Sequence, residues 1–471
     1  MIHIVVVSFY FAGLAAAGHA ALNARTAQGA VAWALFLIMF PFIGLPFYLV
    51  FGRNKFQGLS EAFEASEARI RQLTRKLRSK LEPYRLEPAD GPSWHRALRR
   101  IAAGAGLTRG NHATLLINGQ ATFDDLLAGV AQAERYILFQ FYMIHDDGLG
   151  KRVKEALIER AKVGVEIRVL YDEVGSSGLP GSYVRELERN GIAVSAFKPT
   201  RGLFNRFQLN FRNHRKMVVV DGRVGWVGGH NVGDEYLGLD PEFSPWRDTH
   251  VRIEGPAALQ LQAAIVTDWY WATREMPELE WVPHPSPDGD QLAMIVPTGP
   301  TGHLETASLL FVSAFSAAEK RIWLTAPYFV PDEAVMKALE LAALRGVDVR
   351  IVTSGKGDSL PVYLAAFHYL YELRDLGIRF YVYEPGFLHQ KVLLVDDDIS
   401  AVGTHNFDNR SFRLNFEVMA VIVDRDFGTR MAAMFEADFA HARRMEPNEL
   451  DRHSMWWWLA VRLARLASPV L

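Results

Sequence analysis

The feature that most limits how this chain can fold is a polar string that occurs twice with identical spacing. In both copies a histidine, one residue and a lysine are followed by an aspartate, and a glycine and an asparagine close the string. The copies run through His214, Lys216, Asp221, Gly228 and Asn231, and through His389, Lys391, Asp396, Gly403 and Asn406. So long a pattern does not recur by chance, so the chain contains a duplicated unit.

The duplication extends beyond the polar string. Gly164–Leu170 (GVEIRVL) matches Gly346–Val352 (GVDVRIV) almost residue for residue. Near the first copy, the apolar run Tyr136–Tyr142 is followed by the helical stretch Gly150–Lys162, which is the pattern of a parallel sheet covered by helices. The Pro- and Gly-rich segment Pro285–Gly302 is the natural seam. The predicted fold class is α/β, with two sandwich-like halves.

Strand geometry predicts which members of the string act together. The run after Lys216 is β-branched, and side chains on a strand alternate in direction, so His214 and Lys216 share a face. Asp221 has the opposite parity and is interpreted as a turn or support residue. A two-residue turn starting at Asp221 would place Gly229 opposite His214, with Asn231 on the same face.

This surface suits a phosphate group. Lysine and amide groups can hold non-bridging oxygens while an imidazole acts on phosphorus or on the leaving oxygen. Gly229, or Thr404 in the second copy, would leave room for a substrate group beside the histidine. One imidazole cannot be both nucleophile and leaving-group acid in a displacement, so we expect His214 and His389 to share one active site.

Two acids are expected to orient the imidazoles. Asp248 follows the first string by a short span, and Glu417 follows the second. Each is therefore paired with the histidine of its own half, Asp248 with His214 and Glu417 with His389. The alternative is that both are ordinary surface acids.

Neither a metal nor a cofactor is expected. The chain has no cysteine, which excludes thiolate metal sites and disulfides. No His-x3-His or His-Glu-x-x-His pattern occurs, and the motif lysines would repel a cation. Ser354–Gly357 is glycine-rich but lacks the spacing of a phosphate-binding loop, so a strand-to-helix turn is the simpler interpretation.

The N-terminus predicts a membrane anchor. Ile2–Leu22 carries no charged residue, and Gly29–Gly52 is a second apolar run. Each is long enough to span a bilayer as a helix, and membrane helices tolerate the kinks expected at Pro41 and Pro46. A cleaved signal peptide and a buried hairpin of a soluble domain are the alternatives; a two-helix transmembrane hairpin fits better because both runs are apolar all round.

Charge sets the expected topology. Arg25 alone lies in the short loop, whereas Arg53, Lys55, Arg69 and Arg71 follow the second span, which places the rest of the chain in the cytoplasm. The basic stretch continues to Lys80, and it is either a solvated helix face or a contact with anionic lipid. The net charge of -2 argues against nucleic acid as a partner.

At this point the residues identify a family. The paired strings resemble those of the phospholipase D superfamily over the chain from Ala113 onward, and Trp33–Arg53 is similar to the anchor of bacterial cardiolipin synthases. The resemblance implies that two phosphatidylglycerols become cardiolipin and glycerol at a bacterial cytoplasmic membrane, without a cofactor. One departure is Gly229, where many members carry Ser.

The resemblance also implies roles. A phosphohistidine would form on His214, with His389 as acid and then base. The implied catalytic set is His214, Lys216, Asp221, His389, Lys391 and Asp396, with Asn231, Asn406 and Thr404 binding phosphate. The open alternatives are phosphatidylethanolamine or water as the second substrate, a superfamily nuclease, and a scaffold with an inactive site. The number of subunits is left open.

The expected layout has five parts. Residues 1–55 form the transmembrane hairpin and 56–112 basic linker helices, and residues 113–290 and 291–450 form two phospholipase D-like repeats related by a pseudo-two-fold axis. Residues 451–471 hold Trp456–Trp458 with two arginines beyond, which suits an amphipathic helix at the membrane interface or one packed on the soluble part.

Overall fold

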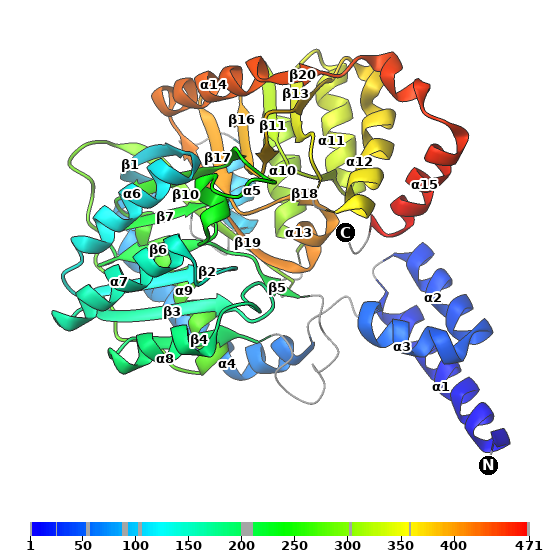
Figure 1. Cartoon of the computed structure of the whole chain (residues 1–471), viewed down its shortest axis with the longest axis horizontal. Coiled ribbons are helices and arrows are strands. Elements are labelled where there is room, and N and C mark those ends of the chain that lie inside the picture. The colour runs from blue at the N-terminus through cyan, green and yellow to red at the C-terminus, as the bar shows by residue number, and fades with distance from the viewer. Residues whose placement is uncertain are drawn as a thin grey trace.

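A computed structural model describes residues 2–24, 26–52, 57–86, 93–101, 106–198, 211–300, 304–357 and 359–468 (Figure 1). Arg25, Arg53 and Lys55, on which the expected topology partly depends, lie outside the described residues.

The elements of the first half, in chain order, are β1 (Thr108–Ile117), α6 (Asn118–Ala131), β2 (Tyr136–Phe141), α7 (Gly148–Lys162), β3 (Glu166–Asp172), α8 (Gly181–Arg189), β4 (Ala193–Phe197), β5 (Arg212–Asn213), β6 (Met217–Val220), β7 (Val224–Gly228), η2 (Asp234–Leu237), β8 (Trp246–Arg247), β9 (Thr249–Glu254) and α9 (Ala258–Thr273).

Those of the second half are β10 (Gln291–Thr298), α10 (Thr306–Ala317), β11 (Arg321–Thr325), β12 (Phe329–Val330), α11 (Glu333–Leu344), β13 (Asp348–Ser354), α12 (Leu360–Leu373), η3 (Arg374–Leu376), β14 (Arg379–Tyr383), β15 (Phe387–Leu388), β16 (Val392–Val395), β17 (Ile399–Gly403), β18 (Phe407–Asp408), α13 (Asn409–Arg413), β19 (Asn415–Val423), α14 (Arg425–Ala440), β20 (Ala442–Arg444), η4 (Pro447–Arg452) and α15 (Met455–Leu466).

One sheet runs through both halves, and apart from β20 at one end its strand order is palindromic about the central pair β1–β10. One arm runs β9, β7, β6, β2, β3, β4, and the other runs β19, β17, β16, β11, β13, β14, β20. In each arm an inner strand pairs in parallel on one side and antiparallel with the motif strand on the other: β2 with β3 and β6, and β11 with β13 and β16. The predicted duplication of an α/β unit is confirmed.

Helices cover both faces of this sheet. Figure 1 shows α6, α7 and α8 around the first arm and α10, α11 and α12 around the second. The core beneath α9 and α14 mixes residues of both halves, including Leu259 and Ile265 from α9 with Met431 and Phe435 from α14. Because burial of apolar surface is the main stabilising term of folding, the two halves depend on each other for stability.

The hairpin that follows each motif has a turn of three residues. Val220 pairs with Val224, and Val395 pairs with Ile399. Asp221 and Gly222 both adopt positive φ, 53° and 67°. The predicted two-residue turn was therefore wrong, and continuing the register places His230, not Gly229, opposite His214.

The N-terminal segment forms α1 (Ile2–Asn23), α2 (Ala27–Met39) and α3 (Pro41–Phe51). Helix α1 is long and apolar enough to cross a membrane, and it is the one such helix among the described residues. The second apolar run is broken at Phe40, where φ is -132° and ψ is 59°, and α3 starts with Pro41. A second span with a kink at Pro41 was predicted; the structure breaks the helix there, because proline removes the amide that would continue it.

A basic helix follows the apolar N-terminal helices. Helix α4 (Gln57–Leu81) buries Leu73, Leu77 and Leu81 against the core shared by the halves. Its cationic side chains are exposed: Arg69, Arg71, Arg75, Lys76, Arg78 and Lys80. The short helices η1 (Glu82–Tyr84) and α5 (Ser93–Ile101) connect it to β1.

The C-terminal helix α15 has two different faces. Val461 is fully buried, and the rings of Trp457 and Trp458 lie 4.7 Å from those of Phe367 and Tyr371 on α12. The opposite face exposes Met455, Trp456, Leu459, Leu463 and Leu466. Packing against the soluble part is thus observed, and the apolar outer face that suits a membrane interface remains.

Candidate active site

Each histidine is placed by a short strand pair that joins the two halves. Strand β5, just before His214, pairs in parallel with the start of β19, and β15, just before His389, pairs in parallel with β8. The amide of His214 donates to the carbonyl of Phe416 at 3.0 Å, and the amide of His389 donates to that of Arg247 at 2.8 Å. Each histidine therefore lies beside the segment that carries the acid of the opposite half.

The acids consequently pair across the halves. Nδ1 of His214 lies 2.9 Å from Oε2 of Glu417, and Nδ1 of His389 lies 2.8 Å from Oδ2 of Asp248. The predicted partners were the right acids, but their assignment to histidines of the same half was wrong. A carboxylate only accepts hydrogen bonds, so Nδ1 carries the proton and Nε2 keeps its lone pair for chemistry.

The two motif lysines are buried beside the histidines. Nζ of Lys216 donates to the carbonyl of His214 at 2.7 Å, and Lys391 donates to the carbonyl of His389 in the same way. Lys216 also lies over the ring of Tyr142, 5.1 Å from its centroid. Burial lowers the pKa of Lys216 well below its usual value, and the charge of Glu417 opposes that shift. An anionic phosphate would compensate this buried charge.

The two motif asparagines differ in their surroundings. Oδ1 of Asn231 accepts from the amide of Met143 at 3.2 Å, and Nδ2 donates to the hydroxyl of Tyr236 at 2.6 Å. Oδ1 of Asn406 is buried without a hydrogen-bond partner among the described residues. Asn231 is thus held in place by protein groups on both sides of its amide.

The small residues beside the histidines accommodate the acids, not the substrate. A Cβ added at Gly229 would lie 2.0 Å from Oδ1 of Asp248. The hydroxyl of Thr404 donates to Oε2 of Glu417 at 2.6 Å and is fully buried. The predicted phosphate contact of Thr404 is therefore corrected: its hydroxyl positions Glu417.

The motif aspartates stabilise backbone turns. Oδ1 of Asp221 accepts from the amides of Arg135 and Tyr136 at 2.9 and 2.8 Å. Oδ1 of Asp396 accepts from the amide of Lys320 at 2.7 Å. Their inclusion in the catalytic set is corrected to the support role that strand parity predicted, because their carboxylates tie the motif hairpin to β2 and β11.

Two buried ion pairs that the sequence did not predict hold the centre together. Nη1 of Arg215 lies 2.7 Å from Oδ1 of Asp268, and its Nε donates to the carbonyl of Glu417 at 2.9 Å. Arg247 binds both carboxylate oxygens of Asp438, at 2.7 and 2.8 Å. Each arginine adjoins a catalytic residue in sequence, so both pairs fix the backbone on which the histidines and acids sit.

Burial disfavours the charged form of both histidines. Desolvation lowers the pKa of His214 to about 4, against the opposing charge of Glu417. Desolvation and the charges of Lys391 and Lys216 lower the pKa of His389 well below its usual value. Burial opposes ionisation of Glu417, but the hydrogen bond from Nδ1–H of His214 helps to lower the pKa of Glu417 to about 2, so the acid stays ionised.

A cluster that could hold a cation lies outside this centre. Ligand atoms of His145, Asp147 and Glu235 lie within 4.8 Å of one another. Both oxygens of Asp147 already accept backbone amides, from Gly150 at 2.9 Å and Asp234 at 2.7 Å. These bonds explain the aspartate as a helix cap and give no reason to place a metal there.

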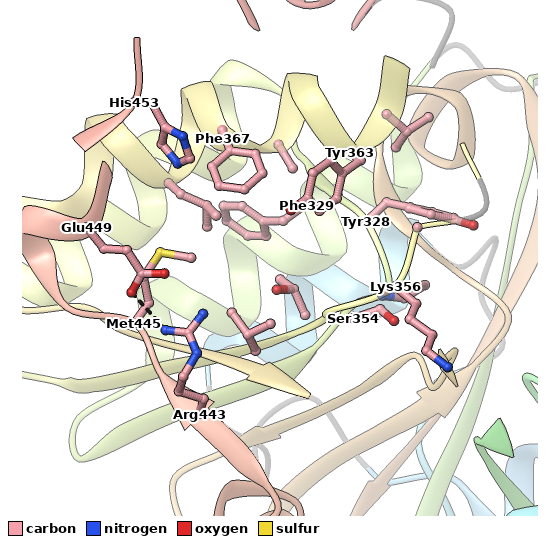
Figure 2. Close-up of a pocket in the computed structure, with 17 residues that line it drawn as sticks. Tyr328, Phe329, Ser354, Lys356, Tyr363, Phe367, Arg443, Met445, Glu449 and His453 are labelled. Atoms are coloured by element: carbon pink, nitrogen blue, oxygen red, sulfur yellow. Dashed lines mark hydrogen bonds and ion pairs between the residues drawn. The ribbon is translucent and has the colours of Figure 1, made fainter. Parts of the chain in front are cut away.

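An apolar cavity of about 140 Å³ lies in the second half (Figure 2). Phe329, Tyr363 and Phe367 line its interior, and Arg443 and Glu449 lie at one end beside His453. At the other end, Ser354 accepts from the amide of Leu388, next to His389, at 3.3 Å. The cavity thus borders the segment that holds the second histidine.

Comparisons with known proteins identify the family of this chain. The family described as cardiolipin synthase, PLD-like domain, matches residues 126–263 and 311–439, and the family described as phospholipase D-nuclease N-terminal matches residues 6–53. The chain is 47% identical over 467 residues to cardiolipin synthase A of Pseudomonas fluorescens, covering 98% of this chain and 97% of the relative. The chain belongs to the cardiolipin synthase family of the phospholipase D superfamily.

Another family member gives the same result, and a solved structure shares the fold. Cardiolipin synthase A of Pseudomonas aeruginosa is 46% identical over 462 residues, 98% of this chain and 94% of the relative. The crystal structure of phosphatidylserine synthase from Haemophilus influenzae matches with a TM-score of 0.60 at 10% identity, over 80% of this chain and 100% of that one. At that identity the match shows a shared fold alone.

Proposed function

We propose that this cardiolipin synthase family member transfers a phosphatidyl group from one phosphatidylglycerol to a hydroxyl of a second, and releases glycerol. The observation that supports this most directly is the pair of buried histidines, each with its Nδ1 bound to a carboxylate of the opposite half. The palindromic sheet suits a pseudo-two-fold axis through this centre. Two equivalent imidazoles supply the nucleophile and the acid that a two-step displacement at phosphorus needs.

In the first step Nε2 of His214 attacks phosphorus and the bond to the glycerol oxygen breaks. Nε2 of His389 gives its proton to that oxygen, so glycerol leaves as a neutral alcohol. Lys216 and Lys391 compensate the charge of the non-bridging oxygens. The product is a phosphatidyl group bonded to His214, and the choice of His214 as nucleophile follows the family.

In the second step the hydroxyl of another phosphatidylglycerol takes the place that glycerol left. His389, now neutral, accepts its proton while the oxygen attacks phosphorus and the bond to His214 breaks. Two in-line displacements retain the configuration at phosphorus. One phosphodiester replaces another, so the exchange is nearly balanced in free energy and needs no ATP.

The negative charge of the substrate favours the protonated form of His389, the acid of the first step. After burial, the charges of Lys391 and Lys216 are the next largest causes that lower the pKa of His389. A bound phosphodiester anion offsets both ammonium charges and thereby raises that pKa. His389 therefore takes up its proton as the substrate binds.

The anchor and the exposed basic and apolar faces suit a site at a membrane surface. We propose that α1 to α3 insert in the bacterial cytoplasmic membrane as a two-span anchor with the catalytic part on the cytoplasmic side. The exposed cations of α4 would then meet anionic headgroups, and the apolar outer face of α15, with Trp456 at 73% exposure, would enter the interface.

Mass spectrometry of the products tests this function. Purified full-length protein is incubated with phosphatidylglycerol alone, with phosphatidylglycerol plus phosphatidylethanolamine, and with plasmid DNA. Cardiolipin and one glycerol per turnover are expected from phosphatidylglycerol alone. Cardiolipin formed only when phosphatidylethanolamine is present, phosphatidic acid as the main product, or cleaved DNA would each replace the proposal with one of its alternatives.

A further inference from the structure

The surroundings of the two histidines break the internal symmetry of the site. Two residues before the histidine, the first half has Arg212 and the second has Phe387. Four residues after the motif asparagine, the second half has Arg410 where the first has Glu235. The ring of Phe387 stacks with that of His389 at 5.8 Å, whereas the matching position beside His214 holds the cationic Arg212.

The fold brings the two arginines to the same place. Arg212 lies in β5 and pairs with Asn415, the first residue of β19. Arg410 lies on α13, and its carbonyl accepts from the amide of Leu414, the residue before Asn415, at 2.7 Å. Both side chains are half-buried. Two arginines from opposite halves therefore have their backbones beside the start of the strand that carries Glu417.

Tyr142 connects this arginine pair to the reacting histidine. Its ring lies 4.9 Å from that of His214, between centroids. Burial raises the pKa of Tyr142, and the charges of Arg212 and Arg410, together with a hydrogen bond from Arg212, oppose the rise. Tyr142 thus contacts His214 and also interacts with both arginines.

Two nearby acids accept hydrogen bonds from backbone amides. Asp172 accepts from the amides of Val174 at 2.9 Å and Asn213 at 2.8 Å. Asp408 accepts from the amide of Ser411 at 2.6 Å. Burial and the neighbouring charge of Arg212 lower the pKa of Arg410. Two adjacent half-buried cations gain most from an anion that lies between them.

We propose that Arg212 and Arg410 bind the phosphate of the acceptor phospholipid, the phosphate that is not transferred. This inference rests on the proposed function. The product contains two phosphates joined by a three-carbon glycerol, and one of them is bonded at the histidines during transfer. The flexible glycerol lets the other reach the arginine pair while its hydroxyl is at phosphorus. Water and simple alcohols lack that phosphate, so the pair selects the acceptor.

A competition between two soluble acceptors tests the proposal. Full-length protein in detergent is incubated with phosphatidylglycerol that carries labelled acyl chains and with equal concentrations of glycerol 3-phosphate and ethanol. Mass spectrometry measures phosphatidylglycerophosphate, phosphatidylethanol and cardiolipin together. In Arg212→Gln and Arg410→Gln, charge-assisted hydrogen bonds to the acceptor phosphate are lost. The ratio of phosphatidylglycerophosphate to phosphatidylethanol, and that of cardiolipin to phosphatidylethanol, are therefore expected to fall about tenfold or more.

The matched variants separate recognition from folding. Arg212→Lys and Arg410→Lys keep the charge and should restore part of the ratio. Lys337→Gln removes one positive charge from an exposed residue of α11 that is paired with Glu340, and it should leave the ratio unchanged. Glutamine variants that lose all three products equally, or that keep the wild-type ratio, would overturn the proposal. Wild-type protein that forms phosphatidylethanol but no cardiolipin would instead overturn the proposed function.

Discussion

Oε2 of Glu417 lies 2.9 Å from Nδ1 of His214, although 203 positions separate the two residues in the chain. Asp248 and His389 form the reciprocal contact. Neither half therefore contains a complete catalytic pair, and each acid acts on the histidine of the other half. This crossing makes the roles of the acids experimentally separable.

The first prediction concerns Asp248→Asn and Glu417→Gln. Each amide removes the charge that orients and stabilises one imidazole, so kcat for cardiolipin formation should fall by about 10² to 10⁴ in both variants. A phosphatidyl ester of p-nitrophenol needs no proton on its leaving group. On that substrate Asp248→Asn should recover most of the release of p-nitrophenol in a burst measurement, whereas Glu417→Gln should not.

The same measurement assigns the nucleophile. Recovery in Glu417→Gln but not in Asp248→Asn would make His389 the residue that bonds to phosphorus. His214→Ala and His389→Ala provide the matching pair of controls, since recovery must follow the acid that contacts the histidine in question.

The second prediction concerns the buried ion pair between Arg247 and Asp438. Arg247→Ala leaves Asp438 buried without its bidentate partner and should lower the free energy of unfolding by about 3–5 kcal/mol. Asp438→Ala should cost a similar amount, and the double variant should cost less than the sum, as measured by denaturant unfolding in detergent. Arg443→Ala, which breaks a more exposed pair with Glu384, should cost only about 0–1 kcal/mol. An additive double variant would show that the pair is not coupled.

The sequence predicted the duplication, the α/β class and the residues of the centre because all of these depend on local patterns. Strand parity alone placed Asp221 off the catalytic face, where the structure finds it bound to the amides of β2. The crossed acids could not be predicted, because they depend on two-residue strand pairs between segments far apart in sequence, such as Arg212–Asn213 with Asn415–Phe416. Such short pairs leave no periodic signal.

The helix break at the N-terminus and the wrongly predicted motif turn have different causes. The apolar run up to Phe51 has the composition of one span, and only the backbone at Phe40 and Pro41 shows that it forms two helices. The turn after β6 takes a third residue because Asp221 adopts positive φ, a choice that the Asp-Gly pair allows but does not dictate.

The third prediction concerns Gly229→Ala. The new Cβ would lie 2.0 Å from Oδ1 of Asp248, so the carboxylate must move away from His389. A displacement of about 1 Å at a catalytic group is expected to lower kcat by about 10²-fold. Because the displaced carboxylate impairs His389 as the acid, the burst of p-nitrophenol from the p-nitrophenyl ester should be restored. Gly178→Ala, at a site with nothing within 4 Å of the added carbon, should leave kcat unchanged. Unchanged kcat in Gly229→Ala would show that Asp248 needs no fixed position.

The last prediction concerns stability in acid. The pKa of His214 is lowered to about 4, and those of His230 and His250 to about 3, in each case chiefly by burial. The rings of His230 and His250 are hydrogen-bonded to each other, with their Nδ1 atoms 2.9 Å apart, a bond that requires at least one neutral ring.

These shifts fix the sign and the window of the pH dependence. An unfolded histidine takes up a proton near pH 6.5, whereas the folded ones do so only below about 4, so the unfolded state binds more protons in between. Stability should be flat above pH 6.5 and fall as the pH drops from 6.5 toward 4, by about 1.4 kcal/mol per pH unit for each histidine. Glu417, whose pKa is lowered to about 2, adds a further loss below about 4.5.

Denaturant unfolding of the detergent-solubilised protein between pH 4 and 8 measures this dependence. His250→Gln changes stability at every pH because the site is buried, so the informative quantity is the slope. The variant should show a smaller slope than the wild type between pH 4 and 6.5, because it takes up fewer protons on unfolding. His441→Gln, at the exposed cap that follows α14, serves as the control for replacing a histidine outside the buried core. Equal slopes in wild type and His250→Gln would mean that this histidine is already protonated in the folded protein, and the burial argument for the pair would fail.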